Sequence, residues 1–132
     1  MRCEVCRDKA ASHICRKCHR LVCEDCYSAS HDACLDCAQV ISSQETWYRL
    51  TLDRITALDR AFEEALRRET CRDCPVLRDS LLRTLADLKR IGAMARVDGF
   101  EDIEREVREV YRRVERKAMT YLARLMMRLK RP

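Results

Sequence analysis

The 132-residue sequence contains no run of apolar residues long enough to cross a membrane, which takes roughly 18 of them. Its first residues, MRCEVCRDK, lack the apolar segment and the small-residue cleavage site of a signal peptide, so we expect none. Glycine and proline occur only twice each, and no Gly/Pro-rich linker divides the chain. We therefore expect an intracellular, cytoplasmic protein whose cysteines stay reduced.

Aromatic residues are scarce, at 5% of the chain, so any apolar core has to be built mainly from Leu, Val, Ile and Ala. No Ser/His/Asp set, phosphate-binding loop or pair of carboxylates in a cleft can be recognised, and we expect no enzymatic activity. Charged residues, in contrast, make up 37% of the chain. The basic excess is strongest in residues 116–132, which hold six cations and no acid, so a nucleic-acid interface would be expected there.

Cysteine is the residue in excess: the chain has ten, and eight of them precede residue 38. These eight form four Cys-x-x-Cys pairs, Cys3/Cys6, Cys15/Cys18, Cys23/Cys26 and Cys34/Cys37. Each pair can place two thiolates on a tight turn at a distance that suits one tetrahedral zinc ion. A segment of fewer than about 40 residues cannot build an adequate apolar core, so zinc is expected to supply the folding energy. We predict two zinc ions in residues 1–38, and a head closed by disulfides is the alternative.

The short gaps between the pairs favour interleaved sites. Only four residues separate Cys18 from Cys23, which is awkward if neighbouring pairs surround one ion. The first and third pairs would then form one site, from Cys3, Cys6, Cys23 and Cys26. The second site would take Cys15 and Cys18 with two of the three residues His31, Cys34 and Cys37. Two zinc ribbons in sequence are the competing arrangement.

This pattern resembles the B-box zinc finger of tripartite-motif proteins and of plant B-box regulators. The residues that match the family pattern cover about a quarter of the chain, Cys3, Cys6, Cys15, Cys18, Cys23, Cys26, His31 and Cys34. The departures are a Cys in place of the last His, and the additional Cys37. The resemblance implies that His31 and Cys34 complete the second site, with Cys37 as the alternative ligand to His31. It also implies a coiled coil after the zinc module, and binding of a protein partner.

Beyond residue 38 the apolar residues take a helical period. A stripe from Tyr48 to Leu66 predicts a helix over about residues 43–69, and a leucine-rich stripe predicts a second helix that stops near Gly92. A third segment follows Gly99, with a nearly heptad spacing from Ile103 to Leu125. Each apolar stripe has to be buried against another helix or a second chain. We expect an all-α helical hairpin or three-helix coiled-coil bundle over residues 43–132, and a homodimer formed through these helices.

The segment CRDCP, residues 71–75, interrupts the helical pattern. Cys71 and Cys74 can be simple thiols or a disulfide that closes a turn between helices. They can also form a four-thiolate zinc site with a second chain, or a redox pair whose pKa is lowered by Arg72 and a helix N-terminus. A shared site with Cys37 is not expected, because a helix of roughly 40 Å would separate them.

The sequence thus predicts a non-enzymatic adaptor, in which a zinc-finger module at residues 1–38 binds a protein and a helical region at 43–132 self-associates. A RING-like ubiquitin-ligase module is one rival, because RING domains share the interleaved plan. A RING normally has a longer gap between its first two ligand pairs than the eight residues found here. A nucleic-acid-binding or transcription-regulating protein that uses residues 116–132 is the other rival.

Overall fold

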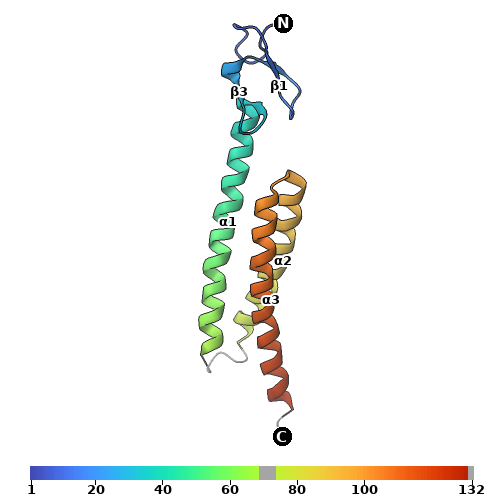
Figure 1. Ribbon diagram of the computed structural model, residues 1–132. Helices are drawn as coiled ribbons and strands as arrows, with labels where there is room; N and C mark the ends of the chain where they lie inside the picture. Colours follow the sequence, from blue (N-terminus) through green and yellow to red (C-terminus); the bar gives the residue numbers. More distant parts are fainter. Residues whose placement is uncertain (69–73, 131–132) are drawn as a thin grey trace. The chain divides into compact units, whose positions relative to one another are not determined.

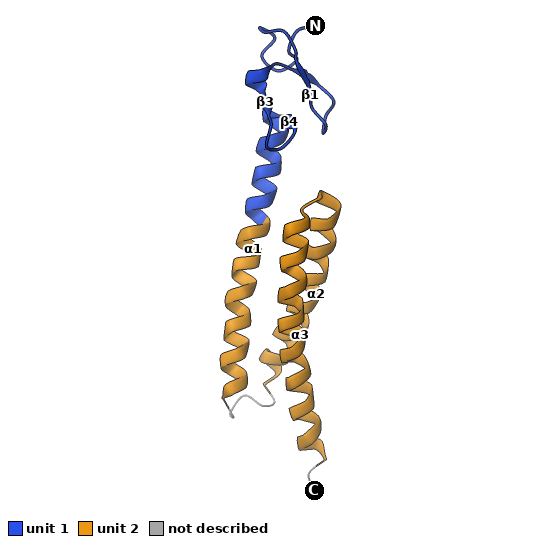
Figure 2. Ribbon diagram, viewed as in Figure 1, with its two compact units in different colours: residues 1–47 blue, residues 48–132 orange. Residues whose placement is uncertain are grey.

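The structure is a computed structural model that describes residues 1–68 and 74–130. Its elements follow the order β1 (His13–Ile14), β2 (Leu21–Val22), η1 (Glu24–Cys26), β3 (Tyr27–Ser28), β4 (Ala33–Cys34), α1 (Leu35–Arg67), α2 (Pro75–Asp98) and α3 (Glu101–Leu129) (Figure 1). The chain divides into two compact units, unit 1 at Met1–Trp47 and unit 2 at Tyr48–Pro132, and the division falls within α1 (Figure 2). Among the described residues, no helix is both long and apolar enough to span a membrane.

Unit 1 is built from very short antiparallel strand pairs. β1 pairs with β2, β3 pairs with β4, and an isolated bridge joins Arg2 to Ala10. Its buried core consists of cysteines with two small apolar residues, Val22 and Ala33. Such a core buries little apolar surface, so unit 1 needs a further source of folding energy, as the sequence predicted.

Two helix boundaries differ from those predicted. α1 begins at Leu35, directly after Cys34, instead of near Ser43. In the first turns of this helix Ala38 is buried and Val40 is exposed. α2 continues through Gly92 to Asp98. A Cβ atom at residue 92 would lie 3.2 Å from Cγ1 of Val107, so this glycine allows α3 to approach α2 closely. Gly99, with φ of +81°, is the residue that ends α2.

Unit 2 is a bundle of three helices whose predicted apolar stripes meet in one core. Its buried members are Tyr48, Leu52, Ile55, Phe62, Leu77, Leu81, Leu88, Ile91, Ala95, Ile103, Val107, Val110, Val114, Ala118 and Tyr121. α1 and α3 lie in register along the bundle: the Arg49 guanidinium pairs with Glu106, and Arg124 donates a hydrogen bond to the carbonyl of Leu66. The protein is therefore mostly helical, with a small cysteine-rich region of short strands at its N-terminal end.

Asp59 is the polar break in the apolar stripe of α1, and it is buried with only 5% of its surface exposed. Its Oδ1 lies 2.7 Å from Nζ of Lys117, and its Oδ2 lies 3.6 Å from Nε of Arg113. A buried carboxylate between two cations of the neighbouring helix is satisfied only when α1 and α3 keep this register. The ion pairs therefore specify how the two helices align.

We predict that Asp59→Ala lowers the free energy of unfolding of unit 2 by about 2 kcal/mol, because Lys117 loses its carboxylate partner. This is less than the cost at a fully buried pair, since the Lys117 side chain keeps 17% of its surface exposed. Urea unfolding followed by circular dichroism measures the change. Asp53→Ala is the control: Asp53 is exposed on α1, and the loss there should stay below about 0.5 kcal/mol. Equal losses in the two variants would contradict the role given to Asp59.

Candidate metal centre

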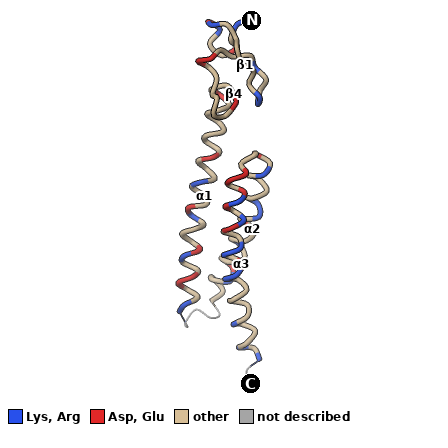
Figure 3. The backbone as a smooth tube through the Cα atoms, in the orientation of Figure 1, with Lys and Arg blue, Asp and Glu red and all other residues tan. Residues whose placement is uncertain are grey.

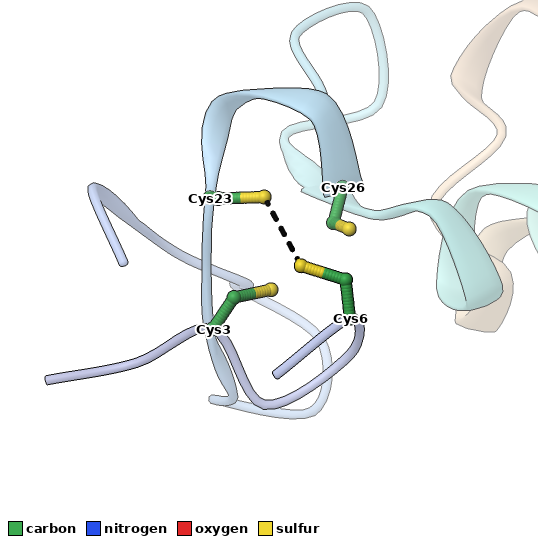
Figure 4. A group of neighbouring side chains, drawn as sticks. All are labelled: Cys3, Cys6, Cys23 and Cys26. Carbon is green, nitrogen blue, oxygen red and sulfur yellow. Dashed lines mark hydrogen bonds between the residues drawn. The ribbon is translucent and has the colours of Figure 1, made fainter. Parts of the chain in front are cut away.

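The eight cysteines of unit 1 gather into two groups of four, Cys3, Cys6, Cys23 and Cys26 in site one and Cys15, Cys18, Cys34 and Cys37 in site two. Within each group all four sulfur atoms lie within 4.8 Å of one another. In site one the four thiols point toward a common centre, and Sγ of Cys6 lies 3.8 Å from Sγ of Cys23 (Figure 4). In site two Sγ of Cys18 lies 3.8 Å from Sγ of Cys34.

These sulfur–sulfur distances fit a tetrahedral metal ion. Zinc–sulfur bonds of about 2.3 Å give a tetrahedron whose edges are about 3.8 Å long. A disulfide would need the two sulfurs at about 2.05 Å, and all eight cysteines are free thiols. The two cysteine tetrads could therefore each hold one metal ion. Four thiolates in tetrahedral geometry are a donor set that zinc favours.

Both sites combine one cysteine pair from a turn with one pair from the start of a helix. In the turns, the N–H of Arg7 donates to the carbonyl of Cys3 and the N–H of His19 to that of Cys15, at 3.0 and 2.8 Å. Arg7 and His19 both have positive φ, which curls the chain tightly after the second cysteine of each pair.

The remaining pairs lie at helix N-termini. Cys23 precedes η1, which ends at Cys26, while Cys34 precedes α1 and Cys37 lies in its first turn. Each site therefore takes two of its four thiols from a helical segment or from the residue directly before it.

His31, which the family pattern favoured as a ligand, lies outside both groups. Its Nδ1 is 3.2 Å from the hydroxyls of Ser28 and Ser30. Cys37, the alternative ligand, joins site two because α1 begins at Leu35 and places Cys37 one turn after Cys34 on the same side of the helix. The other seven predicted ligands all lie in the two groups, and metal binding by these residues stays a prediction.

The thiols of each site have widely separated pKa values. Burial alone would raise the pKa of Cys3 and of Cys15, but hydrogen bonds from backbone N–H groups outweigh it and lower both to about 6. Burial, followed by hydrogen bonds with the other thiols, raises the pKa of Cys26 to about 12. The pKa of Cys37 also rises to about 12, first through its hydrogen bond with Cys34 and then through burial. All four thiols of a site can therefore ionise near neutral pH only around a cation.

Arg20 is a further member of site two that the sequence did not single out. Its Nε donates to Sγ of Cys18 at 3.2 Å, and its Nη2 lies 3.4 Å from Sγ of Cys34 and 3.2 Å from Asp36. The Cys18 thiol, and next the Asp36 carboxylate, raise the pKa of Arg20 above its usual value. A divalent ion with four thiolates carries a charge of −2, which this guanidinium partly balances.

Cys71 lies outside the described residues, so the three interpretations of the CRDCP segment stay predictions. Cys74 is half-buried, directly precedes α2 and packs against the core of unit 2.

Comparison with known proteins adds no relative. No family model matches the chain, and neither the curated proteins nor the solved structures yield a match.

Cys37→Ala should reduce the metal content from two ions per chain to one, because it leaves site two with three ligands. His31→Ala should leave it at two. Native mass spectrometry of the two purified variants measures the stoichiometry directly. Loss of an ion in His31→Ala with two ions retained in Cys37→Ala would restore the ligand set implied by the B-box pattern.

Metal affinity should rise with pH between 6 and 8. Protons compete with the metal for the thiols, and at neutral pH each metal-free site still holds at least the proton of Cys26 or of Cys37. Each site then releases one proton or more on binding, so its affinity should increase at least about tenfold per pH unit. Competition with a chromophoric chelator measures this slope, and an affinity independent of pH would contradict it.

Proposed function

We propose that the chain is a non-enzymatic, zinc-binding protein-interaction module with a B-box-like zinc finger, followed by a helical region through which it self-associates. The interleaving of the two tetrads is the observation that carries this proposal: the first cysteine pair meets the third, and the second meets the fourth. Interleaving of this kind is typical of the B-box. Four thiolates around each ion leave no coordination position open for water or substrate, which supports a structural role for the metal.

Self-association is supported by an exposed apolar stripe on α3, made of Met119, Leu122, Met126 and Leu129. These four side chains are between 45% and 77% exposed, and their 3-4-3 spacing places them along one side of the helix. We call them the outer stripe. It is distinct from the buried face of α3, to which Ala118 and Tyr121 belong.

The outer stripe is self-complementary when two copies of α3 run antiparallel. With a two-fold axis at residue 124, Met119 would face Leu129 of the second copy, and Leu122 would face Met126. Arg124 itself is turned toward α1, where it donates to the carbonyl of Leu66, so it would not meet its own copy. Four side chains form a small interface, and the dimer should therefore dissociate on dilution.

Analytical ultracentrifugation of the full chain tests this dimer. At high concentration the mass should approach twice 15.6 kDa, and Leu122→Glu combined with Met126→Glu should return it to 15.6 kDa, because four carboxylates would meet in the interface. The matched control is Leu82→Glu combined with Val97→Glu, which places the same charges at exposed apolar positions of α2. A monomeric wild type, or equal dissociation of both double variants, would contradict self-association through the outer stripe.

A nucleic-acid-binding function is the second candidate, and the six cations of residues 116–132 favour it. Two of them already have partners within the chain, since Lys117 pairs with Asp59 and Arg124 with the carbonyl of Leu66. Binding of a labelled oligonucleotide that falls steeply between 50 and 200 mM salt would favour this candidate over the adaptor.

The adaptor role is tested by quantitative affinity capture from cells of the source organism, with the wild type compared with Cys15→Ala/Cys18→Ala. Proteins that bind the wild type should be lost with the variant, because site two cannot form.

The purified chain should not accelerate the discharge of ubiquitin from a conjugating enzyme. Such discharge would contradict the adaptor role and favour the RING-like alternative.

A further inference from the structure

A polar cleft of about 470 Å³ opens between α1 and α3 within unit 2. Its walls are formed by Thr56, Asp59, Arg60 and Glu63 from α1 and by Arg113, Arg116, Lys117 and Thr120 from α3. We call it the α1–α3 cleft. Every side chain in these walls is charged or carries a hydroxyl, so the cleft differs in character from the apolar core of unit 2.

The α1–α3 cleft has a net charge of +2, from four cations and two carboxylates. Both carboxylates are already paired: Asp59 holds Lys117 and Arg113, while Glu63 lies 3.3 Å from Arg67. The side chains of Arg60 and Arg116 make no hydrogen bond or ion pair within residues 1–68 and 74–130. Two guanidinium groups therefore come from facing walls without a counter-ion of their own.

Asp59 positions Lys117 and Arg113, and both side chains keep N–H groups that can donate to a ligand. The Lys117 ammonium has three N–H donors, and one of them donates to Oδ1 of Asp59, at 2.7 Å. Arg113 approaches Asp59 through Nε, which leaves the terminal N–H groups of its guanidinium for another acceptor. A buried carboxylate that holds two cations in place lowers the entropy lost when an anion binds.

We propose that the α1–α3 cleft binds a small polyphosphate anion, with Arg60 and Arg116 as the clamp and Lys117 at the base. Arginine pairs with phosphate oxygens through two parallel hydrogen bonds, and two arginines can hold two phosphoryl groups in this way. A ligand with a single carboxylate would leave one of the two guanidinium groups without a negative partner. The walls offer no large apolar side chain for an organic group, so recognition acts on the polyphosphate itself. This site is independent of the proposed zinc-module function.

Isothermal titration calorimetry of the full-length, zinc-loaded protein with sodium pyrophosphate, at constant ionic strength, tests the proposal. We expect one saturable site per chain. Arg60→Gln and Arg116→Gln should each weaken binding by about tenfold or more. Arg116→Lys should also weaken it, because it keeps the charge and loses the paired hydrogen bonds. Arg112→Gln is the matched control, because Arg112 lies on the same helix as Arg116, is exposed and does not line the cleft. The pyrophosphate affinity of this variant should stay within about twofold of the wild-type value.

Three results would overturn the site. The first is the absence of saturable pyrophosphate binding to the wild type. The second is equal weakening in Arg112→Gln and Arg116→Gln, which would mean that only the overall charge matters. The third is an oligonucleotide that binds more tightly than pyrophosphate and is weakened equally by all the arginine variants, as expected of an extended surface for nucleic acid. A urea-unfolding curve followed by circular dichroism for each variant confirms that unit 2, which carries the cleft, has folded.

Discussion

Four thiols held within 4.8 Å of one another can all be ionised only if a cation lies among them, and unit 1 is built on two such groups. Backbone N–H groups favour the thiolate at Cys3 and Cys15, whereas the pKa values of Cys26 and Cys37, raised to about 12, keep these two thiols protonated at neutral pH without metal. The remaining core of unit 1 is small, with Val22 and Ala33 as its buried non-cysteine members. If the two tetrads hold metal ions, metal binding and the folding of this unit are expected to be one process.

The first turn of α1 contributes to site two. Because α1 begins at Leu35, Cys37 lies in its first turn and joins Cys34, which directly precedes the helix, in the second tetrad. In unit 2 the register of α1 is set separately, by the buried Asp59 between Lys117 and Arg113. Acidic and basic residues are interspersed along α1 and the N-terminal part of α3 (Figure 3), and most ion pairs of the helices are exposed and contribute little to stability. Asp59 is the exception because it is buried.

The sequence was sufficient for the interleaved pairing of cysteines and for the three apolar stripes, since both depend on spacing along the chain. The choice between His31 and Cys37 was not predictable in this way, because it depends on where α1 begins. The predicted helix end near Gly92 was wrong for a similar reason: a glycine can end a helix or let two helices approach, and here α2 continues to Asp98 while Val107 lies against Gly92. Arg20 reaches two cysteines of site two through the fold alone, so the sequence carried no signal for it.

X-ray absorption spectroscopy at the zinc edge of the purified protein tests whether unit 1 holds two all-cysteine zinc sites. Two zinc ions per chain, each with four sulfur ligands at about 2.3 Å and no nitrogen or oxygen neighbour, is the predicted result. An average of three and a half sulfurs and half a nitrogen per zinc would place His31 in the second site, and would contradict two zinc sites made of cysteine alone.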